Sequence, residues 1–375
     1  MNAVEARLDR LRGSAAPRAH NARTISALAS NPGCARRAVM DAAGVDKQRV
    51  AAHVGHPAPF GQSQFAITRG NAFEAQVKAG GCAQLLRLLR ERLRLPIPEV
   101  SYANLDDVAG DTSNKVRHAR TRALLARAAA SGQDAGTLFD HPLLRLRAGG
   151  RAVYLEPDLI AFQLRGRFHV VEIKSFAVID GQADGGKVAA AVIQSAVYVL
   201  ALRDLLAELG TGPEAVSDEV VLVCPKDFSN EPTAALLDVR KQLTVLRRQL
   251  ARLDRIEDLL AQIPQAVTFD LEPDAAGVPR RDRRALELAI GAVPARYTPE
   301  CLETCEMCRF CREEAAGSTA ALGRATRDDL GGIDDIGTVL ELARGSVPPA
   351  DHQAEAAAAI RAAARMRGEI LGATG

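Results

Sequence analysis

Two apolar stretches, at residues 155–162 and 170–173, constrain the fold of this 375-residue chain more than any other feature. The Leu-Arg-Gly-Arg-Phe segment at residues 164–168 lies between them and is typical of a hairpin turn. We therefore expect two neighbouring strands that bring Asp158 beside Glu172. Strand residues two apart point to the same face, so Glu172 and Lys174 should emerge together. The sequence thus predicts two carboxylates and an ammonium at one sheet edge.

This set of side chains indicates a particular chemistry. Paired carboxylates are hard oxygen ligands for Mg²⁺ or Mn²⁺. A lysine beside them can orient or activate water near a scissile phosphate. Short E-x-K strings also occur by chance on exposed strand faces, where the charges have no function. The pattern therefore predicts phosphodiester cleavage, with a solvated strand face as the alternative.

The arrangement resembles the PD-(D/E)xK nuclease superfamily. It is most similar to the branch of CRISPR-associated iron–sulfur exonucleases and the nuclease domains of RecB- and AddB-type helicase–nucleases. The family's aspartate corresponds to Asp158, and its E-x-K to Glu172 and Lys174. Its downstream helical Q-x-x-x-Y corresponds to Gln194 and Tyr198, which share one helix face at a spacing of four. The resemblance covers about residues 24–313.

One element of the family departs from the pattern. A glycine followed four residues later by a metal-binding histidine corresponds here to Gly70 and Glu74. Glu74 is still a competent oxygen ligand, although the exchange bears on metal preference; the alternative is a solvated helix residue. The resemblance implies that Glu74, Asp158, Glu172 and the backbone carbonyl of Ile173 hold one or two Mg²⁺ or Mn²⁺ ions.

Four of the seven cysteines are concentrated near the C-terminus, at Cys301, Cys305, Cys308 and Cys311. No signal peptide precedes the chain, so we expect a reducing cytoplasmic location in which disulfides are rare. Four thiols this close in sequence predict a metal site. Structural zinc sites usually separate two ligand pairs by about a dozen residues or more. A C-x₂-C-x₂-C run with a further cysteine favours a [4Fe–4S] cluster instead.

The family resemblance suggests the cluster ligands. Cys305, Cys308 and Cys311 supply the run, and Cys34 is the distant ligand, as one N-terminal cysteine is in the family. Cys301 is a fifth candidate that could displace Cys305. Metal binding contributes to folding free energy, so we expect the cluster to staple the two chain ends together.

Composition narrows the choice of partners. The formal net charge is only +2, so contact with DNA must come from local patches such as residues 115–122 and 280–284. Such charge runs are also common on solvated helix faces. Aromatic residues are scarce and tryptophan is absent, which argues against an aromatic stacking platform. No run of eighteen apolar residues predicts a membrane span.

The expected fold is α/β, with a mixed central sheet flanked by helices. The resemblance implies a restriction-endonuclease-like core, a helical N-terminal region and an iron–sulfur-stapled C-terminal region. We expect a helical region at 1–135, the nuclease core at 136–230, a helical arm with the cysteines at 231–312 and a helical tail at 313–375. Residues 99–114 read as a loop, and residues 232–260 as a helix.

The function that these expectations favour is that of a metal-dependent DNA nuclease, an exonuclease or a single-strand-directed enzyme. Lys174 would assist the attacking water, while Gln194 and Tyr198 would position the lysine or the strand. The expected partners are single-stranded or end-bearing DNA and a helicase or other repair or antiviral defence proteins. One alternative is a catalytically inactive nuclease-like module that binds DNA or a protein partner. Another is an electron-transfer or sensor protein.

Overall fold

The chain forms two compact units that each combine separate stretches of sequence. The computed structural model describes residues 3–58, 64–91, 100–105, 113–131, 136–149, 151–164 and 167–372. Unit 1 comprises residues 1–16, 33–60 and 263–375, and unit 2 comprises residues 17–32 and 61–262. The four consecutive segments expected from the sequence do not coincide with these units, because stretches distant in sequence pack together.

Unit 2 is built around a six-stranded mixed sheet with the order β1-β2-β5-β6-β7-β8. Its strands are β1 (Val100–Asn104), β2 (Gly136–Asp140), β5 (Leu159–Leu164), β6 (Arg167–Ile173), β7 (Glu219–Pro225) and β8 (Pro232–Asp238). The pairs β1–β2 and β6–β7 are parallel, and the other neighbours are antiparallel. A separate hairpin is formed by β3 (Leu144–Ala148) and β4 (Arg151–Leu155). The mixed central sheet flanked by helices is as expected.

The antiparallel pairing of β5 and β6 confirms the hairpin expected around the candidate residues. Leu159 pairs with Val171, and Ile160 with Val170. Every residue of β6 after Arg167 is buried, so both faces of this strand are covered. Residues 165 and 166 of the expected turn lie outside the described residues. The register therefore fixes which side chains face each other near the end of β6.

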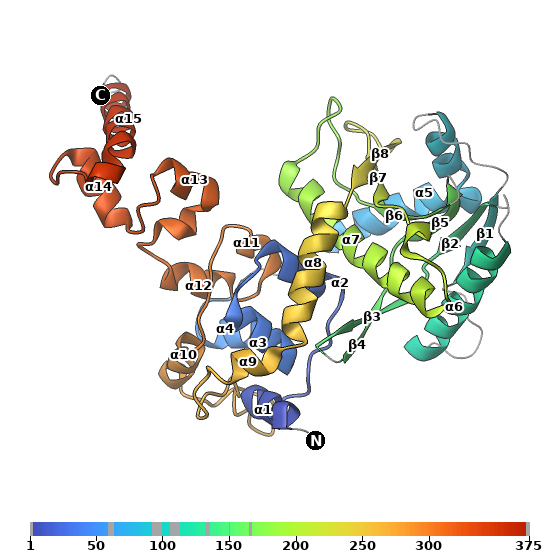
Figure 1. Ribbon diagram of the computed structural model, residues 1–375, viewed down its shortest axis with the longest axis horizontal. Helices are drawn as coiled ribbons and strands as arrows, with labels where there is room; N and C mark the ends of the chain where they lie inside the picture. Colours follow the sequence, from blue (N-terminus) through green and yellow to red (C-terminus); the bar gives the residue numbers. More distant parts are fainter. Residues whose placement is uncertain are drawn as a thin grey trace. The chain divides into compact units, whose positions relative to one another are not determined.

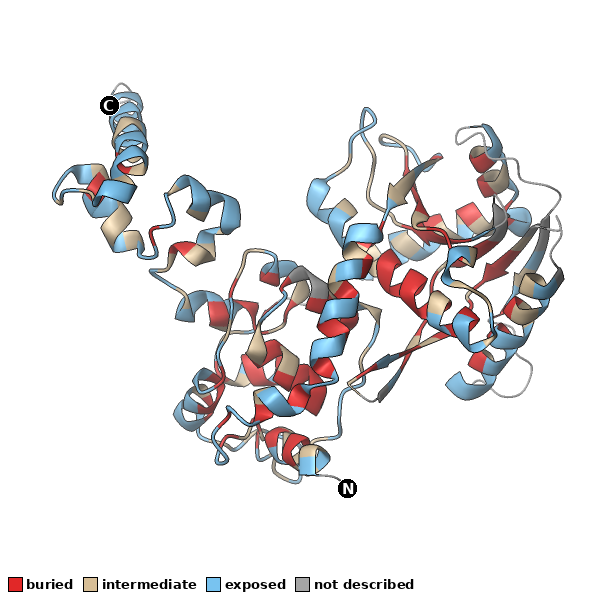
Figure 2. Cartoon of the chain, viewed as in Figure 1, coloured by how far each residue is buried: buried red, intermediate tan, exposed pale blue. Residues whose placement is uncertain are grey.

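Two helices cover the opposite faces of the sheet (Figure 1). On one face, Phe73 and Val77 of α5 (Gln64–Glu91) pack in a core cluster with strand residues that include Val171. On the other face, Ala191 of α7 (Gly185–Glu208) packs with Leu222 of β7. Figure 2 shows buried residues concentrated on the central strands and on α7. Since side chains alternate along a strand, the residues next to Val171 and Leu159 point toward the α7 face.

Helix α5 is interrupted, as the sequence suggested. The dihedral angles of residues 79–82 are not helical, and Gly80 and Gly81 have φ values of 61° and 66°. Glycine adopts such left-handed angles without a steric penalty, which makes the break possible here. The sequence predicts a helix that bears Glu74 and reaches Ala79, and a second helix at residues 83–94; both are observed, although residues 92–94 lie outside the described residues.

By its length and apolar composition, helix α7 could cross a membrane. Among the described residues, no other helix meets both criteria. The sequence had predicted no such segment. Most of its apolar window is buried inside unit 2. Its hydrophobicity is therefore accounted for by packing on the sheet and on neighbouring helices.

Two expectations about local structure are wrong. Part of the loop expected at residues 99–114 forms β1, which pairs with β2, while residues 106–112 lie outside the described ones. Residues 232–238, expected to start a helix, form β8, which pairs with β7 along its whole length. The helix follows only then, as α8 (Arg240–Leu253) and α9 (Ile256–Leu260). Pairing with a neighbouring strand decides the structure of both segments.

The remaining helices of unit 2 support the sheet. They are α2 (Ala22–Ser30), which contacts α7 and α8, and α6 (Asn114–Ser131), which contacts β3 and α7. Unit 1 is helical throughout its regular structure, except for one isolated β-bridge. Its α-helices are α1 (Ala3–Arg12), α3 (Ala35–Ala43), α4 (Lys47–His53), α10 (Arg283–Gly291), α11 (Cys301–Thr304), α12 (Cys308–Glu314), α13 (Arg324–Asp329), α14 (Ile336–Arg344) and α15 (Ala354–Gly372). The tail after α12 is helical, as expected, and has a small core of its own.

Candidate functional site

The two carboxylates expected at one sheet edge are neighbours in unit 2. Extending the β5–β6 register by one residue places Asp158 opposite Glu172. The backbone N–H of Ile173 donates a 2.6 Å hydrogen bond to Asp158 Oδ2. This bond ties the start of β5 to the end of β6 and fixes the Asp158 carboxylate there. Asp158 precedes Leu159 and Glu172 follows Val171, and both apolar residues pack on the α5 face. Because side chains alternate along a strand, the two acids point toward α7.

Lys174 completes the expected set. Its Nζ lies 2.5 Å from Glu172 Oε1, and its backbone N–H donates to the carbonyl of Val223 on β7 at 2.8 Å. The Glu172 side chain is fully buried, whereas that of Lys174 is 28% exposed. Apart from the ion pair with Lys174, neither carboxylate oxygen of Glu172 has a hydrogen-bond partner within the described part of the chain. The ion pair with Lys174 therefore leaves Glu172 able to bind a further cation.

The two acids are held in an environment that disfavours their charge. Burial, reinforced by the charge of Glu172, raises the pKa of Asp158 to about 8. Burial also raises the pKa of Glu172, although Lys174 opposes the shift. Burial alone would lower the pKa of Lys174, but Glu172 and Asp158 raise it overall, so the amine stays charged. A divalent cation between the acids would relieve their repulsion, so the donor set fits Mg²⁺ or Mn²⁺.

The helical pair Gln194 and Tyr198 lies beside the acids on α7. The side-chain amide of Gln194 donates a 2.8 Å hydrogen bond to the Tyr198 hydroxyl. Burial raises the pKa of Tyr198 well above its usual value, and the charges of Glu172 and Asp158 add to this shift. Tyr198 therefore lies close enough to feel the charge of both carboxylates, and the shared helix face of Gln194 and Tyr198 is as the spacing predicted.

Glu74 approaches the same site from α5 but has a partner of its own. Its Oε1 lies 2.5 Å from Nζ of Lys78, one turn further along the helix. The charge of Glu74 nevertheless contributes to the raised pKa of Asp158 and of Glu172. Gly70 lies near Ser175, directly after Lys174, and a Cβ there would make only an ordinary van der Waals contact with the Ser175 hydroxyl. The carbonyl of Ile173 as a metal ligand stays a prediction.

Sequence reasoning missed a second charged group at this sheet edge. Asp140 is the last residue of β2 and His141 follows it, and the backbone N–H of His141 donates to the Asp158 carbonyl at 3.3 Å. His141 Nδ1 lies 3.0 Å from Glu156 Oε1, and Arg117 lies 3.1 Å from the other oxygen of Glu156. An Asp-His pair directly after an apolar strand is a sequence signal that could have found part of this group.

The cysteine segment belongs to unit 1. Cys301, Cys305, Cys308 and Cys311 are all buried on or beside α11 and α12, and Cys34 is half-buried at the start of α3. None of the seven cysteines forms a disulfide. Cys82 and Cys224 are buried in the apolar clusters of unit 2, as expected for cysteines with no ligand role.

A buried arginine joins α3 to the cysteine segment. The Arg36 guanidinium donates to the sulfur of Cys311 at 3.2 Å and to both oxygens of Glu314 at 2.7 and 2.9 Å. Its Nε donates to the carbonyl of Val293 at 3.0 Å. Burial opposes the charge of Arg36, but Glu314 and Cys311 raise its pKa overall. The two ends of the chain are thus already linked at this point.

Two further buried cations, Arg37 and Lys47, lie near the cysteine segment. Arg37 donates to the carbonyl of Thr304, and its buried Nη1 has no hydrogen-bond partner within the described ranges. Lys47 is ion-paired with Asp41 and lies 3.1 Å from Glu306. Buried cations of this kind can balance the negative charge of several thiolates, and the unpaired Nη1 is a donor for a sulfur ligand.

Burial disfavours the thiolate forms of Cys305, Cys308 and Cys311 by raising their pKa values. Burial raises the pKa of Cys305 to about 11 and that of Cys311 to about 12, although Arg37 and Arg36, respectively, oppose the shifts. Metal binding would have to displace these protons, since the thiolate is the ligand. Four buried cysteines among cations fit a metal cluster in their chemistry. Within the described ranges, however, no three His, Cys, Asp or Glu side chains are arranged to hold a metal ion.

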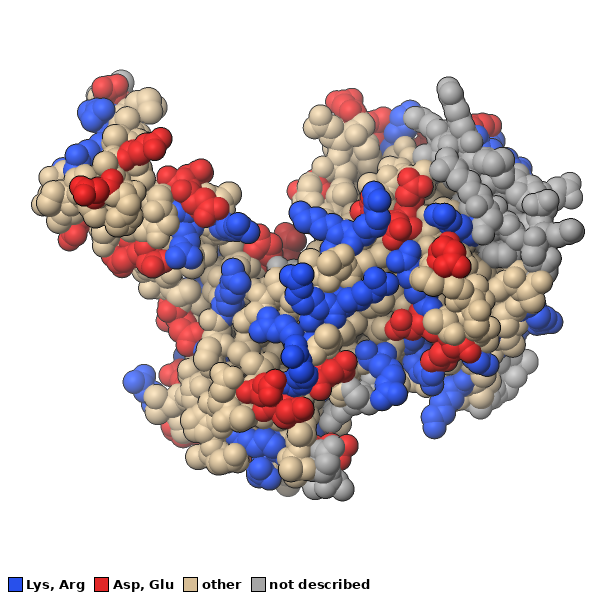
Figure 3. All heavy atoms as spheres, in the orientation of Figure 1, with Lys and Arg blue, Asp and Glu red and all other residues tan. Residues whose placement is uncertain are grey.

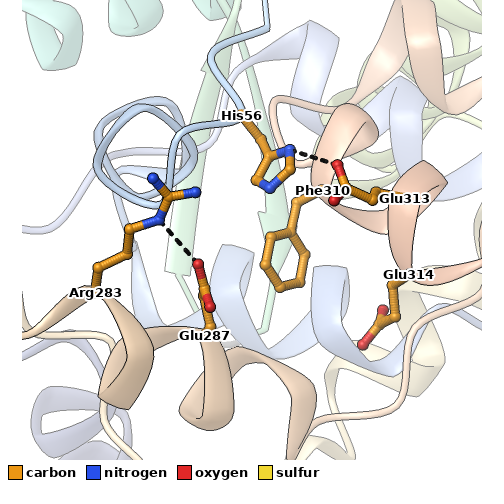
Figure 4. Close-up of a pocket in the computed structure, with 6 residues that line it drawn as sticks. All are labelled: His56, Arg283, Glu287, Phe310, Glu313 and Glu314. Atoms are coloured by element: carbon orange, nitrogen blue, oxygen red, sulfur yellow. Dashed lines mark hydrogen bonds and ion pairs between the residues drawn. The ribbon is translucent and has the colours of Figure 1, made fainter.

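A cavity of about 260 Å³ lies next to the cysteine segment in unit 1 (Figure 4). It is lined by His56, Arg283, Glu287, Phe310, Glu313 and Glu314. The His56 ring packs edge-on against Phe310, and its Nδ1 lies 3.4 Å from Glu313. Each charged group lining the cavity has an ion-pair partner. None of the candidate catalytic residues lines this cavity.

The positive charge of the 280–284 patch is partly paired with acidic side chains. In the 280–284 segment, Arg280 is ion-paired with Asp274 and Arg283 with Glu287, so part of its charge is neutralised. A basic face that the sequence analysis did not single out lies on α8, where Lys and Arg side chains gather (Figure 3). Its exposed members are Arg240, Lys241, Arg247, Arg248 and Arg252.

Comparisons of the chain with protein-family models, with curated protein sequences and with solved structures found no match. The geometry of the two candidate sites therefore carries the functional argument.

Proposed function

We propose that the chain is a metal-dependent DNA nuclease of the PD-(D/E)xK type that hydrolyses phosphodiester bonds. The observation that carries this proposal is the pairing of Asp158 with Glu172 across β5 and β6, with the Lys174 ammonium 2.5 Å from Glu172. Two neighbouring carboxylates can hold a divalent cation, and a lysine beside them can act on the water or the phosphate, as metal-assisted phosphodiester hydrolysis needs.

Each residue has a role that follows from its position. Asp158 and Glu172 bind the cation, and the bond from Ile173 keeps Asp158 oriented. A bound Mg²⁺ or Mn²⁺ ion would lower the pKa of its water and stabilise negative charge on the phosphate. Lys174, partly exposed, can turn from Glu172 toward the attacking water or the phosphate.

The α7 pair supports this arrangement. Tyr198 accepts a hydrogen bond from Gln194, which leaves the phenol proton to be donated toward the carboxylates or the phosphate. In this role Gln194 fixes the tyrosine, and the tyrosine positions the lysine or the DNA strand. Single-stranded or end-bearing DNA is the proposed substrate, and a helicase or another repair or defence protein the proposed partner, both by the family resemblance.

The cysteine segment is proposed to hold a structural [4Fe–4S] cluster in unit 1. Cys34, Cys305, Cys308 and Cys311 are the proposed ligands, with Cys301 as the substitute for Cys305. Its support is the burial of the four C-terminal cysteines among the cations of α3 and α4. The cluster would fasten residues 33–58 to the C-terminal segment and reinforce the Arg36 link.

A cleavage assay tests the proposal. The chain is purified anaerobically and incubated with Mn²⁺ and end-labelled single-stranded DNA, beside Lys174→Ala and the matched control Lys226→Ala. Wild type and Lys226→Ala should cleave, and Lys174→Ala should lose at least about a hundredfold in rate. Equal cleavage by wild type and Lys174→Ala would reject the assigned site.

One observation favours a second candidate, a nuclease-like module that binds DNA or a partner without cleaving. Glu74 is ion-paired with Lys78 in place of a metal-binding histidine of the resembling family. Tight DNA capture without cleavage across Mg²⁺, Mn²⁺ and Co²⁺ would support this candidate. Metal-dependent cleavage that requires Lys174 would reject it.

A further inference from the structure

The ammonium of Lys78 is enclosed by three side chains from different parts of unit 2. Its Nζ lies 2.5 Å from Glu74 Oε1, 2.6 Å from Asp140 Oδ1 and 3.1 Å from His141 Nε2. Only 9% of the Lys78 side chain is exposed. A lysine ammonium has three N–H donors, so these three partners account for all of them.

The side chains around Lys78 form a donor set that suits a divalent cation. They are two carboxylates and an imidazole, and the other ring nitrogen of His141 faces Glu156 at 3.0 Å. A carboxylate on the far ring nitrogen orients a histidine so that its remaining nitrogen can act as a ligand. His141 also has a φ of 49°, in the left-handed region that is unusual for a residue with a side chain. Such backbone strain is typical of residues held for a function.

This group borders the acid pair. The His141 N–H donates to the carbonyl of Asp158, and Asp140 is the partner of Leu159 in the β2–β5 register. The cation of Lys78 therefore sits one strand away from the Asp158–Glu172 pair, on the side from which Glu74 approaches. Glu74 is a residue that both groups would share, since it is ion-paired with Lys78 and its charge acts on both acids.

We propose that Lys78 is a built-in cation that takes the place of a second divalent ion. On this view, which rests on the proposed function, the chain binds a single exchangeable Mg²⁺ or Mn²⁺ ion between Asp158 and Glu172. Glu74, Asp140 and His141 hold the ammonium instead of a metal. Lys78 is then a positioning residue: it fixes Glu74 and supplies a permanent positive charge beside the metal-binding acids.

Metal stoichiometry tests this inference directly. The anaerobically purified full chain is titrated with Mn²⁺, and the free ion is counted by electron paramagnetic resonance. Wild type and Lys78→Arg should each bind one ion, whereas Lys78→Met should bind two because its vacated cage offers Glu74, Asp140 and His141 as ligands. Asp158→Asn should lose the single wild-type ion.

Two results would overturn the inference. One is a wild-type chain that binds two ions, and the other is a folded Lys78→Met variant that still binds one. Circular dichroism establishes whether Lys78→Met folds; if it does not, the wild-type count decides. A chain that binds one ion without cleaving DNA defeats the proposed function alone. A chain that cleaves DNA with two ions bound defeats only the role given to Lys78.

Discussion

Replacing Asp158 by asparagine should make the metal-free protein more stable at neutral pH. The pKa of Asp158 is about 8 in the folded chain, whereas an unfolded aspartate titrates near pH 3.9. Between these values the folded state holds one proton more than the unfolded state, so its stability falls as the pH rises. Asparagine has nearly the same shape and can still accept the hydrogen bond from Ile173.

The size of the effect follows from the same shift. One proton of difference costs about 1.4 kcal/mol per pH unit. Wild type should therefore lose about 3 kcal/mol relative to Asp158→Asn between about pH 5 and about pH 7, and the two proteins should be nearly equal only below about pH 4. His141 is present in both proteins and its contribution largely cancels, whereas Glu172 lies beside Asp158 and its raised pKa also responds to the substitution.

Urea unfolding in EDTA, followed by circular dichroism at several pH values, measures this difference. Adding Mn²⁺ at neutral pH should then reverse the order, because ion binding stabilises only the protein with both acids intact. A wild-type stability that stays level or rises between about pH 5 and about pH 7 relative to Asp158→Asn would refute the reasoning. Equal gains from Mn²⁺ in both proteins would refute the metal assignment.

Three further predictions concern α7 and the cysteine segment. Tyr198→Phe removes the acceptor of the 2.8 Å bond from Gln194 and should lower the free energy of unfolding by about 1 kcal/mol, as measured by urea unfolding; an unchanged value would mean that the tyrosine only packs. Cys308→Ser should lose bound iron and the absorbance expected from the cluster, whereas Cys224→Ser should keep both; iron retained in Cys308→Ser would contradict the ligand assignment. Arg36→Met removes the buried bonds to Cys311 and Glu314 and should destabilise unit 1 by about 3 kcal/mol. Limited proteolysis should then cut the C-terminal segment of unit 1 faster than in wild type. Unaltered proteolysis would count against the Arg36 link.

The parts of the fold that depend on local pattern were predictable from the sequence. The β5–β6 hairpin follows from two apolar stretches around a short basic turn, and α7 follows from a long helical apolar stretch. The break in α5 follows from Gly80 and Gly81. These features need only neighbouring residues, so periodicity and turn chemistry suffice to predict them.

Two segments take their structure from strand pairing rather than from their own intrinsic preference, and these were not predicted. The stretch at residues 232–238 is rich in alanine and leucine, which favour helices, yet it pairs with β7 as an edge strand. In the same way, β1 forms because β2 offers it a parallel partner. Intrinsic preference is weak beside a complete set of interstrand hydrogen bonds.

The candidate site divides along the same line. Asp158, Glu172 and Lys174 were recognisable because one hairpin carries all three. The cage around Lys78 was not recognisable from the sequence. Its side chains come from α5, from the end of β2 and from Glu156, and only the pairing of the strands brings them together. Lys78 is one helical turn from Glu74, so that single contact could have been read from the sequence.

The most direct test of the central claim is a crystal structure of the chain soaked with Mn²⁺, with the ion located by its anomalous scattering. The account predicts one anomalous peak in unit 2, at coordination distance from an oxygen of Asp158 and an oxygen of Glu172, with Lys78 still enclosed by Glu74 and Asp140. A map with no peak between the two acids, or with the ion bound elsewhere in unit 2, would contradict it.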